Sequence, residues 1–396
     1  MLSEQSAATV RATLPVVGAA IGEITERFYT GLFAAHPELL RDLFNRGNQA
    51  AGTQRQALAG SIAAFATHLV DRPDDRPDAM LARIAHKHAS LGVTAAQYDV
   101  VHEHLFAAIA DVLGEAVTPE VAAAWDEVYW LMANALIALE KRLYDESGGH
   151  AWRDWEVVER VPETADVVTL RLRPADRGPV RDFRAGQYVS VGVRLPDGAR
   201  QIRQYSLSGA PGSTVRQISV KRVDGGPGPQ GEVSAHLHAR VREGDVLELS
   251  EPYGDLVLDG ADGSAPLLLA SAGIGVTPMV AMLADLAGRG HRAPVTVVHG
   301  DRSPADHALR ADQETYVRKL ADAELHLWYE REAPQGTRAG LVDLEGVPLA
   351  PGTRAYLCGP LPFMRSVRTA LIARGVAPSA IHYEVFGPDL WLARES

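Results

Sequence analysis

The spacing of apolar residues changes twice along the 396-residue chain. Up to about residue 147, apolar residues recur every three or four positions, which is typical of amphipathic helices. Short β-rich runs separated by Gly and Pro follow, and this pattern favours an antiparallel barrel. Buried-strand runs then alternate with helical stretches, which indicates a doubly wound parallel α/β sheet. The sequence therefore predicts an all-α domain (1–147), an antiparallel β-barrel domain (151–261) and an α/β domain (264–396).

Several helix ends in the first domain have recognisable signals. The segment from Thr94 to Gln97 has the form of a capping box. Thr118 followed by Pro119 is typical of a helix start, and the long helix after it is expected to end at Gly148. The charged run DRPDDRPD, which begins at Asp71, is predicted to be a connecting loop.

Composition narrows the possible classes of protein. The 46% hydrophobic and 22% charged residues are typical of a globular protein. A formal net charge of −11 disfavours nucleic acid and anionic membranes as partners. The chain has neither a run of about 20 apolar residues, as a transmembrane segment requires, nor the features of a signal peptide. Its single cysteine, Cys358, excludes an intrachain disulfide, and a cytoplasmic location is expected.

The stretch ARIAHKHASLG contains two histidines on one predicted helix. His88 falls on the apolar stripe, whereas His86 and Lys87 point away from it, so His86 is expected to face water. The stripe consists of Leu81, Ile84, Ala85, His88 and Leu91. A buried neutral imidazole suits iron, copper or zinc, but one histidine does not make a metal site. His88 is therefore either a hydrogen-bonded core residue or the ligand of a prosthetic group that brings its other ligands.

Two further helices place polar residues on inward faces. Gln54 heads an apolar stripe with Leu58 and Ile62, although from the residues alone a structural glutamine at a helix start is favoured. Tyr98 begins a second apolar stripe, and Glu140 lies close to the inward face of its helix. A lone buried carboxylate is costly, and a hydrogen bond between Glu140 and His88 would remove much of that cost.

Two segments of the later domains have residues that suit nucleotide cofactors. In SAGIGVTPM, Gly273 and Gly275 let the backbone approach a ligand, and Thr277 is predicted to cap a helix that points at a pyrophosphate. The segment lacks the third glycine of the GxGxxG fingerprint, and a purely structural turn is the alternative. In RQYSLS, Arg203 can bind a phosphate and Tyr205 can lie against a planar ring, although an ordinary amphipathic strand has the same composition.

The motifs RQYS, AGIGVTPM, LCGPLPFM and YEVFGP, in this order, resemble those of the ferredoxin–NADP reductase superfamily. With the helical, globin-like domain before them, the whole chain resembles a flavohaemoglobin. The resemblance implies that His88, beside Lys87 in a KH motif, is the proximal ligand of a b-type haem. It also implies the remaining haem-pocket residues, which are Phe44 against the haem, Tyr29, Gln54 and Leu58 on the distal side, and Tyr98 with Glu140 on the proximal side.

The same resemblance assigns the other two cofactors. The implied FAD residues are Tyr188, Arg203, Gln204, Tyr205, Ser206, Val233, Ser234, Glu384, Val385, Phe386, Gly387 and Pro388. The implied nicotinamide dinucleotide residues are Gly273, Ile274, Gly275, Val276, Thr277 and Pro278, with Cys358 and Gly359 near the nicotinamide. The chain departs from the family at Val385, where relatives often have cysteine, and in a longer loop before GEVS.

The implied activity is that of an NAD(P)H-dependent nitric oxide dioxygenase, which converts nitric oxide and dioxygen to nitrate with electrons passed through FAD to haem. The alternatives are a haem-based dioxygen carrier or sensor and an alkylhydroperoxide reductase, and a monomer is expected. Asp301 favours NADH, whereas the adjacent Arg302 can accept the 2′-phosphate of NADPH, so the choice stays open. Zinc hydrolysis is excluded at VHEHLF, because Phe106 stands where an HExxH motif needs its second histidine.

Overall fold

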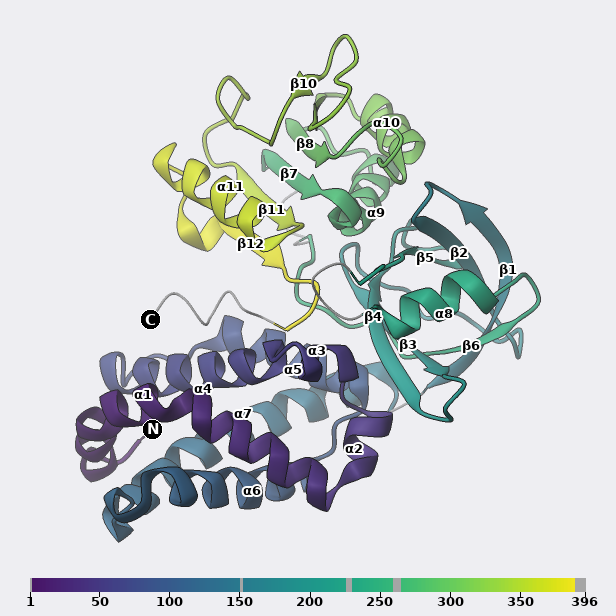
Figure 1. Ribbon diagram of the computed structural model, residues 1–396. Helices are drawn as coiled ribbons and strands as arrows, with labels where there is room; N and C mark the ends of the chain where they lie inside the picture. The colour runs from purple at the N-terminus through teal and green to yellow at the C-terminus, as the bar shows by residue number, and fades with distance from the viewer. Residues whose placement is uncertain (1, 150–151, 226–229, 259–264, 389–396) are drawn as a thin grey trace.

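The computed structural model describes residues 2–149, 152–225, 230–258 and 265–388 (Figure 1). These residues form a helical unit, an antiparallel sheet and a parallel sheet with helices on both faces, which confirms the predicted fold class. The domain limits remain a prediction, and residues 151, 261 and 264, at three of those limits, lie outside the described ranges.

Two helices of the helical unit, α6 and α7, begin at the predicted signals. Its elements are α1 (Glu4–Ala35), α2 (Pro37–Asp42), α3 (Arg46–Ala50), α4 (Thr53–Asp71), α5 (Asp78–Leu91), α6 (Ala95–Leu113), η1 (Gly114–Ala116) and α7 (Pro119–Ser147). The capping box at Thr94 and Gln97 is present, and the Thr118 hydroxyl accepts a hydrogen bond from the backbone of Val121. Helix α7 ends at Ser147, and Gly148 after it adopts the left-handed conformation that glycine tolerates best.

Helix α1 meets the length and composition of a membrane-spanning helix. Its buried residues, which include Ile24, Phe28 and Leu32, belong to the same apolar core as residues of α4, α6 and α7. The helix therefore contributes one wall of the helical unit's core. Tyr29, also buried on α1, faces into that core.

The second unit is an antiparallel sheet that closes on itself. Its elements are β1 (Arg153–Pro162), β2 (Val167–Pro174), β3 (Tyr188–Arg194), β4 (Arg200–Ser206), β5 (Arg216–Lys221), α8 (Glu232–Arg240) and β6 (Val246–Leu249). The strand order is β4-β3-β6-β1-β2-β5, and a bridge between Leu207 and Ile218 joins the two outer strands. This closure agrees with the predicted barrel and encloses an apolar core.

The third unit is a parallel sheet with the order β10-β9-β8-β7-β11-β12. Its elements are β7 (Leu267–Ala272), η2 (Gly273–Gly275), α9 (Val276–Gly288), β8 (Val295–Asp301), α10 (Arg310–Lys319), β9 (Ala323–Tyr329), β10 (Arg338–Ala339), β11 (Arg354–Cys358), α11 (Leu361–Ala373), η3 (Pro378–Ala380) and β12 (Ile381–Glu384). Helices α9 and α10 cover one face and α11 covers the other. Two covered faces explain why these strands are continuous apolar runs.

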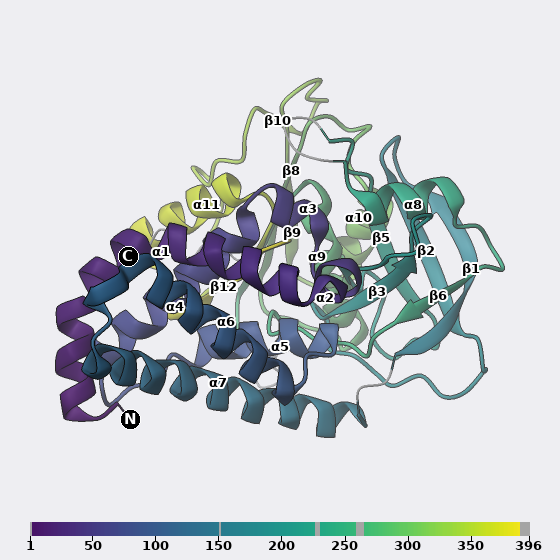
Figure 2. The ribbon, with the colours of Figure 1, turned by 60° about the horizontal axis from the view of Figure 1, so that its bottom comes forward.

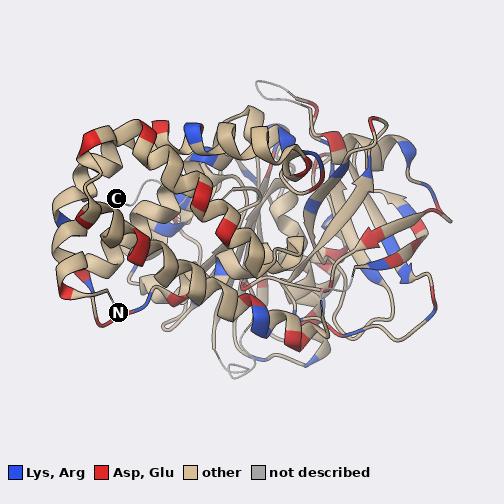
Figure 3. Ribbon diagram, turned by 90° about the horizontal axis from the view of Figure 1, so that it is seen from below, with Lys and Arg blue, Asp and Glu red and all other residues tan. Residues whose placement is uncertain are grey.

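The three units meet around the helical domain's α5 and α2. Helix α5 contacts β3 and α2 contacts β4, while strand β12 ends close to the helical unit (Figures 1 and 2). On the face shown in Figure 3, acidic and basic residues are interspersed along the ribbon and do not form a basic stripe.

Candidate functional site

Three polar side chains from three helices meet at the core of the helical unit. His88 on α5 places Nδ1 2.8 Å from Glu140 Oε1 on α7 and 2.9 Å from the Tyr98 hydroxyl on α6. The Tyr98 hydroxyl donates to the same carboxylate oxygen over 2.6 Å. Glu140 is only 2% exposed, so its charge is stabilised by these two donors. The predicted hydrogen bond between Glu140 and His88 is therefore present.

This arrangement defines the chemistry of the His88 ring. Because the carboxylate accepts a hydrogen bond from Nδ1, the proton of the neutral imidazole lies on Nδ1 and the lone pair on Nε2. Burial, followed by the charge of Glu140, raises the pKa of the Tyr98 hydroxyl well above its ordinary value, so Tyr98 acts as a donor. A carboxylate behind an imidazole fixes the ring and makes it a more basic ligand.

Tyr29 lies in a group of aromatic rings elsewhere in the same core. Its ring centroid is 5.6 Å from that of Phe33 and 5.9 Å from that of Phe44, which lies between α2 and α3. Burial raises the pKa of the Tyr29 hydroxyl, and interactions with the side chains of Gln54 and Gln49 lower it in part. The structure therefore brings Tyr29, Phe44 and Gln54 together, as the resemblance implied. Leu58 packs against the same core from α4.

Gln49 on α3 is a pocket residue that the sequence reasoning missed. Its amide lies beside the Tyr29 hydroxyl, yet the enclosed Nε2 atom has no well-formed hydrogen bond to any described residue. A buried amide donor without a partner is uncommon and calls for a ligand or water. The polar residues after Phe44 in FNRGNQ were the available signal, because they follow the predicted pocket phenylalanine directly.

The position predicted for His86 is wrong. His86 does not face water, because its Nδ1 accepts a hydrogen bond from the backbone N–H of Gly254 over 3.1 Å. Its ring also lies 6.5 Å from that of Tyr253, and burial lowers its pKa. The outward face of α5 is thus the interface with the barrel unit. On the same face, Lys87 Nζ lies 6.0 Å from the centroid of the Tyr188 ring.

The residues assigned to FAD line two neighbouring strands of the barrel. Tyr188 on β3 pairs with Ser206 on β4, and Gln204 donates to the Ser190 hydroxyl over 3.0 Å. Burial lowers the pKa of the Arg203 guanidinium and raises that of the Tyr205 hydroxyl. The Ser206 hydroxyl is buried and has no hydrogen-bond partner among the described residues. A half-buried cation and an unpaired hydroxyl on the same strand suit a polar, anionic ligand.

Helix α8 and the chain end carry the remaining residues assigned to FAD. Val233 and Ser234 are buried in the first turn of α8, where the Ser234 hydroxyl donates to the Gly231 carbonyl and accepts from Val223 N–H. Glu384 ends β12, and the four assigned residues after it differ in exposure: Val385 packs on the α/β core, whereas Phe386 is 46% exposed. Gly387 and Pro388 are the last described residues.

The residues assigned to the nicotinamide dinucleotide lie at one edge of the parallel sheet. Cys358 pairs with Ser271, so β11 and β7 end together, and a Cβ on Gly275 would lie 2.2 Å from the Cys358 carbonyl oxygen. Only glycine fits there. No atom lies within 4 Å of a Cβ placed on Gly273, so the turn offers open backbone at the sheet edge. Burial raises the pKa of the Cys358 thiol, which excludes a reactive thiolate.

Thr277 does not cap the following helix as predicted. The 3₁₀ turn η2 takes up Gly273 to Gly275, so α9 begins at Val276 with Gly275 as its N-cap residue. Thr277 therefore lies within the first turn, where its hydroxyl donates to the Ile274 carbonyl over 2.9 Å. Pro278 lies in the first turn as expected. The backbone amides at this helix start are still suited to an anion.

Comparison with known proteins explains this combination of units. Residues 26–136 match the globin family model, residues 154–257 match the oxidoreductase FAD-binding domain and residues 269–369 match the oxidoreductase NAD-binding domain. A flavohemoprotein of Rhizobium meliloti is 43% identical over 406 residues, which is 99% of this chain and 100% of the relative. One of Bacillus subtilis is 36% identical over 410 residues and 100% of both chains. The chain belongs to the flavohemoprotein family.

Solved structures agree with this membership. A flavohemoglobin from Malassezia yamatoensis, with bound FAD and heme, superposes with a TM-score of 0.91 at 39% identity and covers 98% of this chain and 100% of its own. The FAD/NAD-binding domain of a nitric oxide dioxygenase from Vibrio cholerae has a TM-score of 0.56 at 37% identity, over 60% of this chain and 99% of its own.

The cofactors of this flavohemoprotein family member are haem, FAD and a nicotinamide dinucleotide, and the side chains fit them. The described residues contain no cluster of three or more His, Cys, Asp or Glu that could hold a bare metal ion. One imidazole supported by a carboxylate instead suits a metal that arrives with its own macrocycle. Among the described residues, the Ser206 hydroxyl is buried without a partner, which suits a polar group of the flavin. The open turn at Gly273 leaves room for the dinucleotide.

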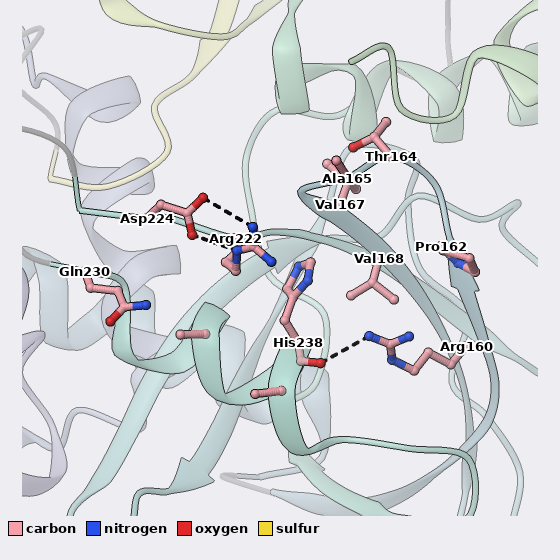
Figure 4. Close-up of a pocket in the computed structure, with 12 residues that line it drawn as sticks. Arg160, Pro162, Thr164, Ala165, Val167, Val168, Arg222, Asp224, Gln230 and His238 are labelled. Carbon is pink, nitrogen blue, oxygen red and sulfur yellow. Dashed lines mark hydrogen bonds and ion pairs between the residues drawn. The ribbon is translucent and has the colours of Figure 1, made fainter. Parts of the chain in front are cut away.

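A cavity of about 530 Å³ lies elsewhere, between the β1–β2 hairpin and α8 (Figure 4). Arg160 donates to the His238 carbonyl at its wall, and Arg222 pairs with Asp224. None of the residues assigned to the three cofactors lines it. Within this family member, the cavity is therefore separate from the haem, flavin and nicotinamide residues.

Proposed function

We propose that the chain is an NAD(P)H-dependent nitric oxide dioxygenase that converts nitric oxide and dioxygen to nitrate. The observation that carries this proposal is helix α5, which holds His88 against Glu140 on one face and contacts the flavin unit with the other. The Vibrio cholerae nitric oxide dioxygenase domain, 37% identical to this chain, supports the activity. When bound, the cofactors supply the redox chemistry: oxidation of the nicotinamide, one-electron transfer from flavin, and activation of dioxygen at iron.

The proximal residues hold a proton at a defined atom. Glu140 keeps the proton of His88 on Nδ1, and Tyr98 supplies the second donor to the same carboxylate. Nε2 is thereby presented as a basic ligand with a fixed ring orientation. The pair Tyr98 and Glu140 therefore tunes the iron through His88 without contacting the substrates.

The distal residues donate hydrogen bonds into the pocket. The Tyr29 hydroxyl stays protonated across the physiological pH range, because burial raises its pKa. It can therefore donate to a bound diatomic ligand, with the Gln54 amide beside it. Phe44 and Leu58 keep the surroundings apolar and exclude water.

Helix α5 lies at a junction shared by all three units. Arg83 on α5 donates to the Tyr383 hydroxyl of β12 over 2.6 Å, and its Nε lies 3.7 Å from the carboxylate of Asp255 in the barrel unit. A side-chain hydrogen bond also connects Ser90 of α5 with Tyr188. These contacts hold the haem helix, the flavin strand and the last strand of the dinucleotide unit together.

NADH is the proposed electron donor, although the sequence left the choice open. Arg302 is held by two carboxylates: its Nη2 lies 3.1 Å from Asp166 Oδ2 and also pairs with Asp306. A guanidinium neutralised in this way is a poor site for a 2′-phosphate. Asp301, at the end of β8, suits a ribose hydroxyl.

The NADH preference is tested by comparing kcat/KM for NADH and NADPH. We expect a clear preference for NADH, which Asp306→Ala should reduce by removing one of the two carboxylates that hold Arg302. Glu314→Ala, which removes the partner of Arg310 on α10, is the matched control and should change nothing. Equal use of both dinucleotides by the unmodified protein would overturn the assignment.

We further infer a cytoplasmic monomer. All three groups of assigned residues lie within one chain, so no second copy is needed to complete a site. The only cysteine is fully buried at the end of β11 and offers no disulfide.

Turnover separates the proposed activity from its two rivals. We expect rapid NADH oxidation when nitric oxide and dioxygen are both present, with one nitrate formed per nitric oxide consumed. A dioxygen carrier or sensor would oxidise NADH slowly under these conditions. An alkylhydroperoxide reductase would instead turn over faster with an organic hydroperoxide than with nitric oxide.

A further inference from the structure

Gln201 is a fully buried residue on β4 that reaches from the flavin strand into the helical unit. It is 0% exposed and lies two residues before Arg203, which is assigned to FAD. Among the described residues, its side chain makes polar contacts with Arg203 on its own strand and with the backbone of residues 40–46. A buried glutamine with both ends occupied has one defined orientation.

The amide nitrogen of Gln201 bonds to the end of α2 and to the haem-pocket phenylalanine that follows it. It donates to the carbonyls of Arg41 over 3.0 Å, Phe44 over 3.2 Å and Leu40 over 3.4 Å. The carbonyls of the last turn of a helix have no partner within the helix, and here they end α2. Gln201 therefore supplies donors that the helical unit itself lacks.

The amide oxygen of Gln201 faces the flavin residue and α3. It accepts from Arg203 Nη1 over 3.3 Å and from the backbone N–H of Arg46 over 3.4 Å. One side chain thus contacts both the guanidinium assigned to the flavin and the backbone that carries Phe44. Through the ring of Phe44, 5.9 Å from that of Tyr29, the contact reaches the distal pocket.

Neighbouring ion pairs tie the same backbone segment to the second flavin-binding element. The Arg46 guanidinium pairs with Asp197 over 2.6 Å and with Glu232 over 2.7 Å. Glu232 is the first residue of α8, beside Val233 and Ser234. The backbone N–H of Arg200 also donates to the Asp42 carboxylate over 3.0 Å. Residues 42–46 are therefore held by the two elements that are assigned to FAD.

We propose that Gln201 is a positioning residue that transmits occupancy of the flavin site to the distal side of the haem pocket. The proposal rests on the haem and flavin assignments above. A flavin phosphate that engages Arg203 takes up guanidinium N–H groups that are otherwise free to bond Gln201. The orientation of the Gln201 amide then depends on whether the flavin is bound. Because the amide donates to the Phe44 carbonyl, the position of Phe44 and its ring also depends on the flavin.

Carbon monoxide bound to the reduced haem is the probe. Its stretching frequency and dissociation rate are measured in the full chain with FAD bound and after FAD is removed, without nitric oxide turnover. In the unmodified protein we expect FAD removal to shift the stretching band and to change the dissociation rate about fivefold, the factor that about 1 kcal/mol of hydrogen bonding represents. In Gln201→Leu both values should be the same with and without FAD.

Gln217→Leu is the matched control. Gln217 is also a buried glutamine, on the adjoining β5. In the described part of the chain, its amide nitrogen bonds to Ser208 within the barrel and its oxygen accepts from Arg171. This variant should keep the full response to FAD. A response that survives in Gln201→Leu, or that is equally lost in Gln217→Leu, would overturn the proposal.

Hydrogen exchange of the unmodified protein covers the case in which Gln201→Leu does not fold. FAD binding should change the exchange rate of the Arg46 amide, which donates to Gln201. The coupling would also be refuted if FAD changed neither the exchange rate of the Arg46 amide nor the stretching frequency of bound carbon monoxide. Because neither measurement uses nitric oxide, a failed dioxygenase assay leaves this test intact.

Discussion

The proximal and distal sides of the proposed haem pocket differ in how their polar groups are satisfied. On the proximal side, His88, Tyr98 and Glu140 come from three helices of one unit and satisfy one another. On the distal side, the Gln49 amide nitrogen is enclosed without a well-formed hydrogen bond. The backbone around Phe44 is in turn held by Gln201 of the barrel.

This difference indicates that the proximal residues adjust the properties of the iron, whereas the distal residues bind the ligand. A buried polar network that is complete in the protein keeps a single geometry, so the proximal side presents one fixed ligand. A buried donor without a partner is stabilised when a ligand arrives, so the distal side is completed by its substrate. The proximal network should therefore control iron properties whatever is bound, and the distal residues should control mainly the lifetime of the bound ligand.

The largest expected effect comes from removing His88. His88→Ala should abolish stable haem binding, because it removes the imidazole that is proposed to bind the iron. The flavin and dinucleotide units should still fold and bind FAD. The haem-to-protein ratio from the absorption spectrum, with flavin absorbance as the internal reference, measures this loss.

His86→Ala is the control for that experiment. Its ring contacts Gly254 and Tyr253 and not the interior of the helical unit, so haem content should stay normal. Because the contact lies between units, the variant should instead slow electron transfer from flavin to haem. Loss of haem from His86→Ala, with retention in His88→Ala, would reverse the assignment of the ligand.

Breaking the proximal network should have the next largest effect. Glu140→Leu removes the acceptor of two hydrogen bonds, and charge-assisted bonds of this kind contribute about 1.5–3 kcal/mol each. The ligand becomes less basic, so the reduction potential of the haem should rise. Glu140→Gln, which keeps an acceptor but no charge, should give a smaller rise. An unchanged potential in Glu140→Leu would remove Glu140 from the proposed tuning role.

Tyr29→Phe tests the distal side at constant packing. The substitution deletes only the hydroxyl, and the loss should cost roughly 1–3 kcal/mol of dioxygen affinity, mostly as faster dissociation. Turnover of nitric oxide should fall most at low dioxygen, while reduction of FAD by NADH and the haem potential stay the same. The measurement is the rate of dioxygen dissociation, determined by stopped flow. Rates equal to those of the unmodified protein would leave Tyr29 as a packing residue.

The sequence predicted those features that depend on apolar periodicity within a single helix. Tyr98 and Glu140 lie on inward stripes, and the structure places both beside His88. His86 was misplaced because a face that is outward for the helical unit is an interface for the barrel. Periodicity within one domain cannot identify such contacts, because the partner residues lie far along the chain.

The features that the sequence did not reveal depend either on very short elements or on contacts between residues far apart in the chain. Thr277 resembled an N-cap, but the 3₁₀ turn before α9 moves the helix start. Arg302 stayed ambiguous because its partner Asp166 belongs to another unit. Gln49 lies on a helix of only five residues, which is too short to show an amphipathic stripe.

The smallest expected effect concerns Gln49, whose enclosed amide donor distinguishes the distal from the proximal side. Gln49→Leu should lower dioxygen affinity by about 0.5–1.5 kcal/mol, the net contribution of one hydrogen bond. Gln56→Leu, an exposed glutamine on the neighbouring α4, is the control and should have no effect. Because Gln49 interacts with the Tyr29 hydroxyl, the two substitutions should not be additive. If Gln49→Leu has its full effect even in the Tyr29→Phe background, the amide acts on the ligand independently of the tyrosine. If it has no effect in either background, the unpaired donor is not used by the ligand, and the contrast between the two sides would rest on Tyr29 alone.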